Sequence, residues 1–178
     1  MLSCMRVVLA LLGALLLTVP AHGGPRAGTV AMTIRVVSVT AGSKVIVDKA
    51  PKGIRSVGDT FWAKSNLRNE HAQFGKPKGA LVGNEVAIYA VESLAIGTTL
   101  AIGTIKMTTS LPGGTIRSSD RRSSEGWGGT ESQVTGGTGV FAGARGTVAS
   151  EPLTGGFVTR SFGHLGDRDR KVYRIKLP

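Results

Sequence analysis

The sequence predicts an all-β fold, most simply a closed antiparallel barrel, and three observations lead to this prediction. Glycine accounts for 26 of 178 residues, about twice the usual ~7%, and this disfavours long helices because Gly in a helix costs about 1 kcal/mol relative to Ala. Hydrophobic residues make up 41% of the chain, which favours folding over disorder. Apolar, β-branched runs alternate with Gly and Pro at regular intervals, as in sandwiches and barrels, and a barrel also hides its strand edges.

The N-terminal segment has the pattern of a secretory signal peptide. Arg6 supplies the basic region, Val7–Val19 the apolar region, and Pro20–Gly23 the small residues typical of a cleavage site. The apolar run is too short for the ~20 residues of a membrane span, so we expect cleavage and no transmembrane anchor. Cleavage would also remove Cys4, the only cysteine, so the exported protein has to be stable without disulfides. We therefore expect a secreted, extracellular protein with a signal peptide at 1–23, a short tether at 24–29 and a single β-barrel domain at 30–178.

Four strand patterns are expected in the first half of the domain. They are Val30–Ala41, Lys44–Asp48, Thr60–Arg68 and Ala80–Glu92. The first two are separated by an expected turn at Gly42 and Ser43. Pro and Gly residues, which are poor in strand interiors, mark loops before and after the third strand.

The strand Ala80–Glu92 separates into two faces, and either could point inward. One face carries Val82, Val86, Ile88 and Ala90, whereas the other carries Gly83, Glu85, Ala87, Tyr89 and Val91. Hydrophobicity alone favours the first face as the core, with Glu85 solvated.

The second half of the domain continues the pattern and brings the total to about eight strands. Thr98–Leu111 leads through a Pro-Gly-Gly turn into Thr115–Ser119, which is a strong hairpin signal. A polar loop is expected at Ser118–Gly129. Two strands flank the glycine-rich segment Val134–Gly146, Phe157–Phe162 is a further candidate strand, and Arg170–Pro178 closes the chain with a period of two.

The order of these motifs resembles the allene oxide cyclase-like barrel superfamily, which also contains the plant dirigent proteins. The resemblance rests on GDTFWAKSNL, LVGNEVAIYAV, the hairpin strand pair, VTGGTGVFAGARGTV and VYRIKL in this order. It implies an eight-stranded antiparallel β-barrel with a central apolar pocket for a small hydrophobic ligand, often assembled as a homo-oligomer such as a trimer. The activities it implies are isomerase-like cyclisation of an unstable fatty-acid epoxide, dirigent-type steering of phenoxy-radical coupling, and ring formation on polyketide-type products. All of these depend on orienting the substrate.

The resemblance also implies candidate pocket residues, because it points the face of Glu85 and Tyr89 inward. A Tyr can hold a ligand by stacking and through its hydroxyl, and a carboxylate in an apolar pocket would have a raised pKa and could transfer a proton. Four positions along a strand separate the two residues by roughly 13 Å, so they could grip opposite ends of one ligand. We expect Tyr89→Ala to weaken ligand binding more than folding, and an equal loss of both would make Tyr89 a core residue.

Ser65 and Arg145 complete the set of candidates. Arg145 falls where the dirigent-type motif also has an Arg, whose planar fork could bind a phenolate or carboxylate. Ser65, in contrast, stands where dirigent proteins have an Asp and the plant cyclases an Asn. The first strand also lacks the acidic and amide residues expected near the cyclase pocket. The resemblance therefore carries over the fold and not a particular plant reaction, and the catalytic residues stay unassigned.

Other chemistries are not supported by the residues present. His71 and His164 have no ligand set at metal spacing and no cysteine to complete a zinc site, so we expect no metal and no cofactor. No Gly-x-Ser-x-Gly elbow indicates a hydrolase. The glycine-rich segment lacks a Walker lysine and a following helix, which favours a bulge or tight bend over a phosphate-binding loop. Trp127, in a glycine-rich loop, either caps a pocket or is exposed.

The chain is basic, with a formal net charge of +11. Its cationic clusters are Arg117, Arg121 and Arg122, and Arg168, Arg170 and Lys171. Because the clusters contain Asp and lack interleaved aromatics, we expect solvated surfaces that contact anionic envelope polymers weakly, and no nucleic acid partner. The alternative to a ligand-binding barrel is a non-catalytic cationic extracellular module whose barrel is filled by side chains.

Overall fold

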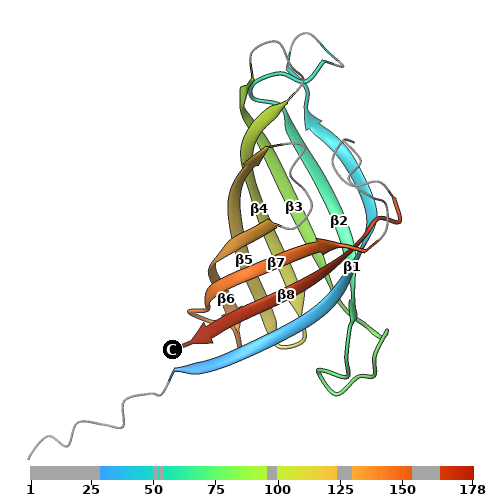
Figure 1. Cartoon of the computed structure of the whole chain (residues 1–178), viewed down its shortest axis with the longest axis vertical. Helices are drawn as coiled ribbons and strands as arrows, with labels where there is room; N and C mark the ends of the chain where they lie inside the picture. Colours follow the sequence, from blue (N-terminus) through green and yellow to red (C-terminus); the bar gives the residue numbers. More distant parts are fainter. Residues whose placement is uncertain (1–28, 50–51, 53, 96–99, 124–129, 154–164) are drawn as a thin grey trace, which may run out of the picture.

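The computed structural model describes residues 29–49, 52, 54–95, 100–123, 130–153 and 165–178. Within this part of the chain, eight antiparallel strands close into a barrel (Figure 1). Each strand pairs with its sequence neighbours, and β8 closes onto β1, so that Val30 lies opposite Leu177. The strands are β1 (Val30–Val47), β2 (Thr60–Asn69), β3 (Leu81–Leu94), β4 (Ala101–Leu111), β5 (Gly114–Ser123), β6 (Thr130–Gly139), β7 (Arg145–Pro152) and β8 (Arg168–Leu177). The expected fold class is confirmed.

Several expected features lie outside the described residues. These are the signal peptide at 1–23, residues 24–28 of the tether expected at 24–29, the candidate strand Phe157–Phe162, Trp127 and His164. Their assignments stay predictions.

Two expected boundaries are wrong. Gly42 and Ser43 do not form a turn, because both stay paired with β2 and the register shift between Thr40 and Gly42 is a β-bulge within one 18-residue strand. A bulge bends and twists a strand without ending it, which lets β1 curve around the barrel. The polar stretch Ser118–Ser123 is likewise part of β5 and pairs with β4. Its polar side chains are compatible with a strand because those that point inward find partners inside the barrel.

The face of β3 that points inward is the one that the family resemblance implies, and not the one that hydrophobicity alone predicts. Glu85 and Tyr89 are buried, whereas Ile88 is 41% exposed. Val82 is also buried, although it belongs to the opposite face of the sequence pattern. The reason is a register shift in the β2–β3 pairing, where Leu67 lies opposite Gly83 and Arg68 opposite Leu81. Val82 is the extra residue of this bulge, so it can point inward as well.

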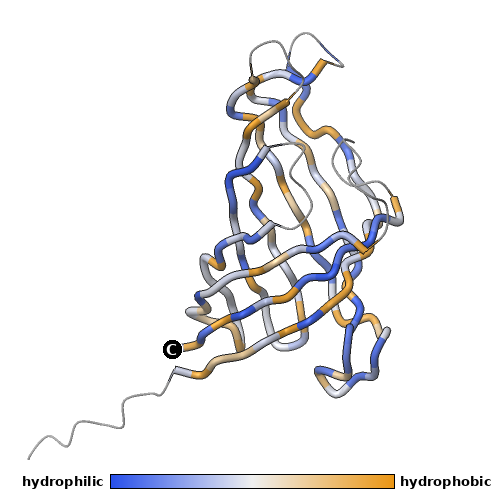
Figure 2. The backbone as a smooth tube through the Cα atoms, viewed as in Figure 1, coloured by the Kyte–Doolittle hydropathy of each residue, from blue (hydrophilic) through white to orange (hydrophobic). Residues whose placement is uncertain are grey.

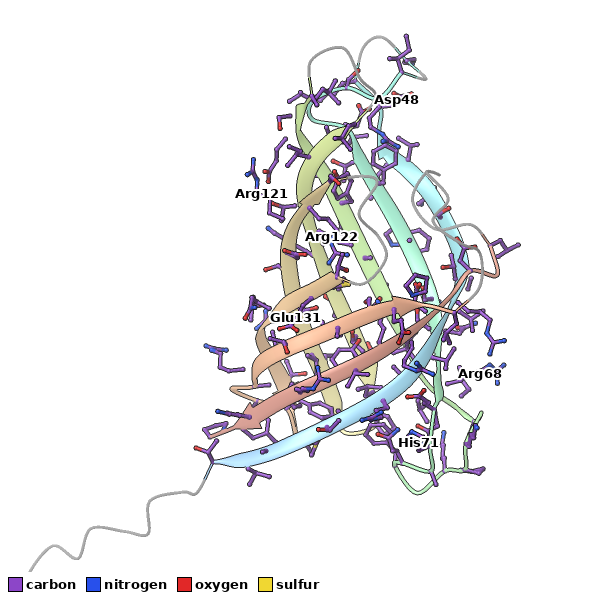
Figure 3. The ribbon with its side chains drawn as sticks, viewed as in Figure 1. Asp48, Arg68, His71, Arg121, Arg122 and Glu131 are labelled. Carbon is purple, nitrogen blue, oxygen red and sulfur yellow. The ribbon has the colours of Figure 1, made fainter. Side chains whose placement is uncertain are left out.

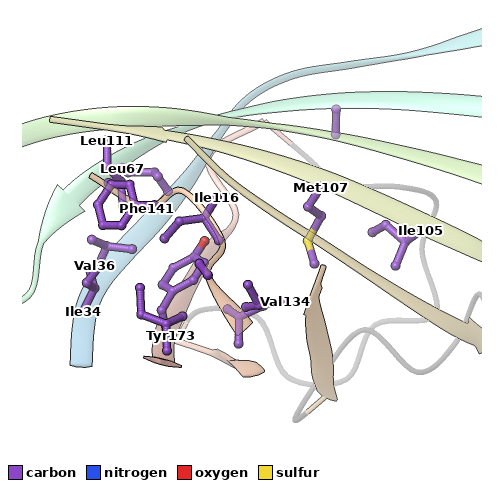
Figure 4. Packing of buried hydrophobic residues seen from close by; sticks show 14 of the residues in the cluster. Ile34, Val36, Leu67, Ile105, Met107, Leu111, Ile116, Val134, Phe141 and Tyr173 are labelled. Atoms are coloured by element: carbon purple, nitrogen blue, oxygen red, sulfur yellow. The ribbon is translucent and has the colours of Figure 1, made fainter. Parts of the chain in front are cut away.

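Apolar side chains fill one end of the barrel. The group includes Ile34, Val36, Leu67, Leu111, Ile116, Phe141 and Tyr173, which gather in one part of Figure 4. Ile105 and Met107 lie further along the barrel. Hydropathy alternates along most strands, as expected when successive side chains face the interior and the solvent in turn (Figure 2). One end is therefore a packed core, and the hydroxyl of Tyr173 at its border contacts the polar interior groups described next.

Two buried polar side chains secure loops at the ends of strands. The Asp59 carboxylate accepts hydrogen bonds from the backbone N–H groups of Lys49, at 2.8 Å, and Ser56, at 2.7 Å. The Asn69 amide donates to the carbonyl oxygens of Gln73 and Lys76, at 2.9 and 3.0 Å. Buried polar groups with such partners satisfy backbone atoms that would otherwise be costly to desolvate.

Candidate site in the barrel interior

Glu85 lies on the inward face of β3 at the boundary of the apolar core. It is 4% exposed, and in the strand register it lies between Ser65 on β2 and Thr109 on β4. A carboxylate buried in this way is stable in its charged form only when cations or hydrogen-bond donors surround it.

The required donors reach Glu85 from β4 and from β8, which is not a sheet neighbour of β3. The Lys171 ammonium donates to Oε1 of Glu85 and forms a buried ion pair with it. Oε2 accepts hydrogen bonds from the Tyr173 hydroxyl and from the Thr109 hydroxyl, each at 3.0 Å. Lys171 Nζ also lies 3.7 Å from the sulfur of Met107. We call Glu85, Lys171, Tyr173 and Thr109 the interior cluster.

The interior cluster fixes which of its groups are charged. Burial by itself would raise the pKa of Glu85, but the charge of Lys171 and the donated hydrogen bonds outweigh it and lower this pKa. Burial and the negative charge of Glu85 raise the pKa of Tyr173 well above its usual value. At neutral pH the cluster therefore contains a carboxylate and a neutral phenol. The expected rise in the Glu85 pKa is wrong, because the pocket around it is not apolar.

A second polar group lies on β5 and β6 and centres on Arg122. Its guanidinium donates to the hydroxyls of Thr130 and Ser132, at 2.7 and 2.6 Å, and lies 3.1 Å from the carboxylate of Asp120. The Arg122 side chain is 7% exposed, whereas the side chain of its neighbour Arg121 is 66% exposed. Figure 3 accordingly shows Arg122 within the outline of the barrel and Arg121 outside it.

These positions correct the expectation that Arg122 and Lys171 belong to solvated cationic clusters. Each side chain points inward and has a carboxylate partner, Asp120 or Glu85. Asp169 lies on the same face of β8 as Lys171, and burial raises its pKa, with a further contribution from Glu85. The described interior therefore contains two charge pairs and one carboxyl group that is more readily protonated than usual.

Tyr89, the second expected pocket residue on β3, points inward and is 1% exposed. Its hydroxyl donates to the backbone carbonyl of Ala101 at 3.1 Å, and its ring centroid lies 6.3 Å from that of Phe61. Burial raises the pKa of its phenol. Tyr89 is thus anchored in the wall by both its ring and its hydroxyl.

Three small side chains and one methionine line the interior between Glu85 and Tyr89. Ala63, Ala87, Met107 and Ser118 lie opposite one another on β2, β3, β4 and β5 and form a single register row. Ala87 is only partly buried, although its neighbours two positions away, Glu85 and Tyr89, are almost fully buried. We call these four residues the small-residue row.

The four expected pocket residues do not lie together. Ser65 is 9% exposed and lies directly opposite Glu85, so it is beside the interior cluster. Arg145, in contrast, is exposed, and its guanidinium donates to the backbone carbonyls of Thr135 and Ala144, at 2.8 and 3.0 Å. Arg145 therefore does not contribute to the interior cluster.

Sequence reasoning missed Lys171, Tyr173 and Thr109. The sequence did contain a signal for Lys171 and Tyr173. In the alternating C-terminal strand pattern these residues share one face with Ile175. A lysine on the same face as a tyrosine and an isoleucine indicates an inward position. Its partner could not be identified, because Glu85 lies 86 positions away.

Two features are absent from the described residues. No group of three or more His, Cys, Asp or Glu side chains in these parts of the chain is arranged to hold a metal ion. Within the described ranges, no helix has the length and apolar character needed to cross a membrane.

Comparison with solved structures identifies proteins with a similar fold. A pyocyanin demethylase matches with a TM-score of 0.56 and 17% identity over 82% of this chain and 99% of that chain. A pterocarpan synthase dirigent protein matches with a TM-score of 0.56 and 17% identity over 83% of this chain and 84% of its own. An exo-specific intermolecular Diels-Alderase matches with a TM-score of 0.53 and 12% identity, covering 83% and 98%. No protein-family model matches the sequence, and no curated protein matches it. The similarity confirms, at the level of the fold, the resemblance to allene oxide cyclase-like and dirigent-like barrels.

Proposed function

We propose that this barrel binds a small hydrophobic or phenolic molecule in its interior and directs the cyclisation or stereoselective coupling of that molecule. The observation that carries the proposal is the interior cluster, an ion pair with two hydroxyl groups inside a barrel. Buried charge costs stability unless it is well paired, and ligand sites combine apolar walls with a few placed polar groups. The fold shared with a dirigent protein and a Diels-Alderase supports the proposal.

The interior charges favour a neutral ligand. Lys171 and Arg122 each have a carboxylate partner, so neither offers an uncompensated positive charge to an acid. Glu85 is ionised at neutral pH and can accept a hydrogen bond from a hydroxyl group of the ligand. The small-residue row would hold the apolar body of the ligand, with Tyr89 and Phe61 beyond it. Rate enhancement would then come mainly from restricting the ligand to a reactive conformation.

Native mass spectrometry of the protein purified from its secretion host tests the proposal directly. We expect a stoichiometric apolar or phenolic molecule that can be released and identified. Thermal shift with fatty-acid epoxides, monolignols and polyketides provides a second measurement. A protein that is empty and shows no shift with any of these compounds would contradict the proposal and favour a structural module.

A pair of matched variants tests where the ligand binds. Ala87→Leu adds volume to the small-residue row, whereas Ala90→Leu makes the same change on the opposite, outward face of β3. We expect Ala87→Leu to weaken binding at least tenfold and Ala90→Leu to leave it unchanged, with circular dichroism confirming that both fold. Should Ala87→Leu not fold, Ser118→Val makes a smaller change in the same row. Equal binding by the inward and outward variants would exclude this part of the interior.

Export is the second part of the proposal and has its own experiment. N-terminal sequencing of the protein from the culture medium should begin near Gly24 if residues 1–23 are a cleaved signal peptide. An intact N-terminus on a cell-associated protein would contradict it. A secreted trimer, as the resemblance implies, would be detected in the same native mass spectrum.

A further inference from the structure

A concave surface lies on the outer wall of the barrel. It has a volume of about 360 Å³, which lies within the ~300–1,000 Å³ range of small-molecule pockets. Its lining comes from β4, β5 and β6. The outward-facing members are Lys106, Thr108, Arg117, Ser119 and Thr135, and Met107 and Ser118, whose side chains are buried in the interior, lie between them along the strands. In the strand register, Lys106 lies opposite Ser119 and Thr108 opposite Arg117, so cations and hydroxyl groups alternate. We call this surface the outer concavity.

Arg145 on β7 brings a second guanidinium to the border of the outer concavity. A Cβ atom placed on Gly136 would lie 3.5 Å from Nη2 of Arg117 and 3.6 Å from Nη1 of Arg145. The two guanidinium groups therefore converge over a residue that has no side chain to separate them. Arg145 is held there by its hydrogen bonds to the carbonyls of Thr135 and Ala144.

The bulge in β6 creates this geometry. Arg117 lies opposite Gly136 and Ser118 opposite Val134, so Thr135 is the extra residue. Its hydroxyl donates to the carbonyl of Arg117 at 3.3 Å, which ties the bulge to β5. The glycine-rich segment of the sequence is thus a bulge, as expected, and it also leaves the space between Arg117 and Arg145 open.

The cations of this surface have no acidic partner among the described residues. Every ion pair in the described ranges involves other side chains, and none includes Lys106, Arg117 or Arg145. Elsewhere on the surface, Arg121 pairs with Glu92, and Arg170 pairs with Glu70 and Glu151. Two converging guanidinium groups and a lysine of the same lining, none of them paired with a carboxylate among the described residues, create a local positive potential that attracts an anion.

We propose that the outer concavity is a binding site for a phosphate group carried on a larger molecule. Guanidinium groups bind phosphate oxygens through paired N–H donors, and a lysine adds a point charge. The donors come from several strands and surround a volume, which suits a tetrahedral anion better than a planar carboxylate. The volume leaves room for a substituent on the phosphate, such as glycerol or a sugar. The cations of this site point away from the barrel interior, so the proposal does not rest on the proposed function.

The experiment compares two double variants with the same change in net charge. Lys106→Gln/Arg117→Gln removes the two cations that line the outer concavity and leaves Arg145 at its border. Lys64→Gln/Arg174→Gln removes two exposed cations of β2 and β8 that do not line it. Binding of glycerol 3-phosphate is measured by isothermal titration calorimetry at low salt, and binding to phosphatidylglycerol vesicles is measured by co-sedimentation.

We expect saturable, salt-sensitive binding of glycerol 3-phosphate to the unmodified protein, weakened at least tenfold by Lys106→Gln/Arg117→Gln and less than twofold by the control pair. Binding to the vesicles with the same dependence on Lys106 and Arg117 would identify a lipid headgroup as the source of the phosphate. Binding of the small ester alone would indicate a free metabolite or a polymer unit. Equal losses in the two double variants, or the lack of saturable binding to either probe, would overturn the proposal.

Discussion

At the scale of single residues, the chemistry of this protein depends on how Glu85 is compensated. The carboxylate lies in the interior of the barrel and has three donors, two of them on β8. Removing one member of a buried ion pair costs more than replacing both, because the remaining charge is left without a partner. The interior cluster can therefore be tested by stability measurements before any ligand is known.

Glu85→Gln should destabilise the protein by about 3–5 kcal/mol, because Lys171 would be left in a buried site without its carboxylate partner. Urea unfolding followed by circular dichroism measures the loss. The double variant Glu85→Gln/Lys171→Met removes both charges and should recover most of the stability. A double variant no more stable than Glu85→Gln would show that the ion pair is not the main contribution of Glu85.

The pH dependence of stability follows from the same pair. Folding lowers the pKa of Glu85 from its usual value of 4.5, so the contribution of this group to stability is fully present above pH 4.5. This contribution is lost as the pH falls through the lower pKa of the folded state. The free energy of unfolding of the unmodified protein should therefore fall more steeply below pH 4.5 than that of Glu85→Gln. Parallel curves for the two proteins would contradict the assigned pKa direction.

At the scale of the strands, bulges and glycines determine which side chains face inward. The bulge at Val82 changes which alternate residues of β3 point inward, so that Val82 is buried as well as Glu85. The bulge at Ala41 bends β1 without ending it. Glycine is required where a neighbouring strand approaches closely. A Cβ on Gly103 would lie 2.0 Å from the carbonyl oxygen of Ala90 and 2.9 Å from the ring of Tyr89.

Gly103→Ala should therefore destabilise the barrel by about 3 kcal/mol, since the carbonyl of a paired strand cannot move aside as a flexible side chain would. Gly42→Ala is the matched control, because its Cβ would meet only Trp62, at 3.9 Å. We expect this control to change stability by less than about 1 kcal/mol. Thermal unfolding of the two variants makes the comparison, and a similar loss in both would show that backbone proximity at Gly103 is not the cause.

At the scale of the whole molecule, charge is compensated in the interior and in excess on the surface. Lys171 and Arg122 are paired inside the barrel, whereas the full sequence has a net charge of +11. An excess of like charge on the surface destabilises a folded protein through mutual repulsion, which salt screens. Buried pairs are screened much less. The two populations of charge should therefore respond differently to ionic strength.

Raising NaCl from about 20 mM to about 300 mM should raise the Tm by about 2–4 °C, because screening of surface repulsion is worth ~1 kcal/mol in a chain of this size. Differential scanning calorimetry measures the change. The destabilisation caused by Glu85→Gln should be nearly the same at both salt concentrations. A Tm that falls with salt would show that surface ion pairs such as Arg121–Glu92 outweigh the repulsion.

Local patterns in the sequence determined the strands, the hairpin at the Pro-Gly-Gly turn and the barrel, because strand formation depends on near neighbours, alternation and turn residues. The order of the motifs also predicted correctly which face of β3 points inward, whereas hydrophobicity alone predicted the opposite face. Only the tertiary structure decided that Lys171 and Tyr173 compensate Glu85, since closure of β8 onto β1 brings residues 86 and 88 positions apart into contact. It likewise placed Arg145 on the outer wall beside Arg117, because a bulge in β6 determines that geometry. Contacts across a barrel depend on its closure and on the register of its strands, and the sequence of a single strand determines neither.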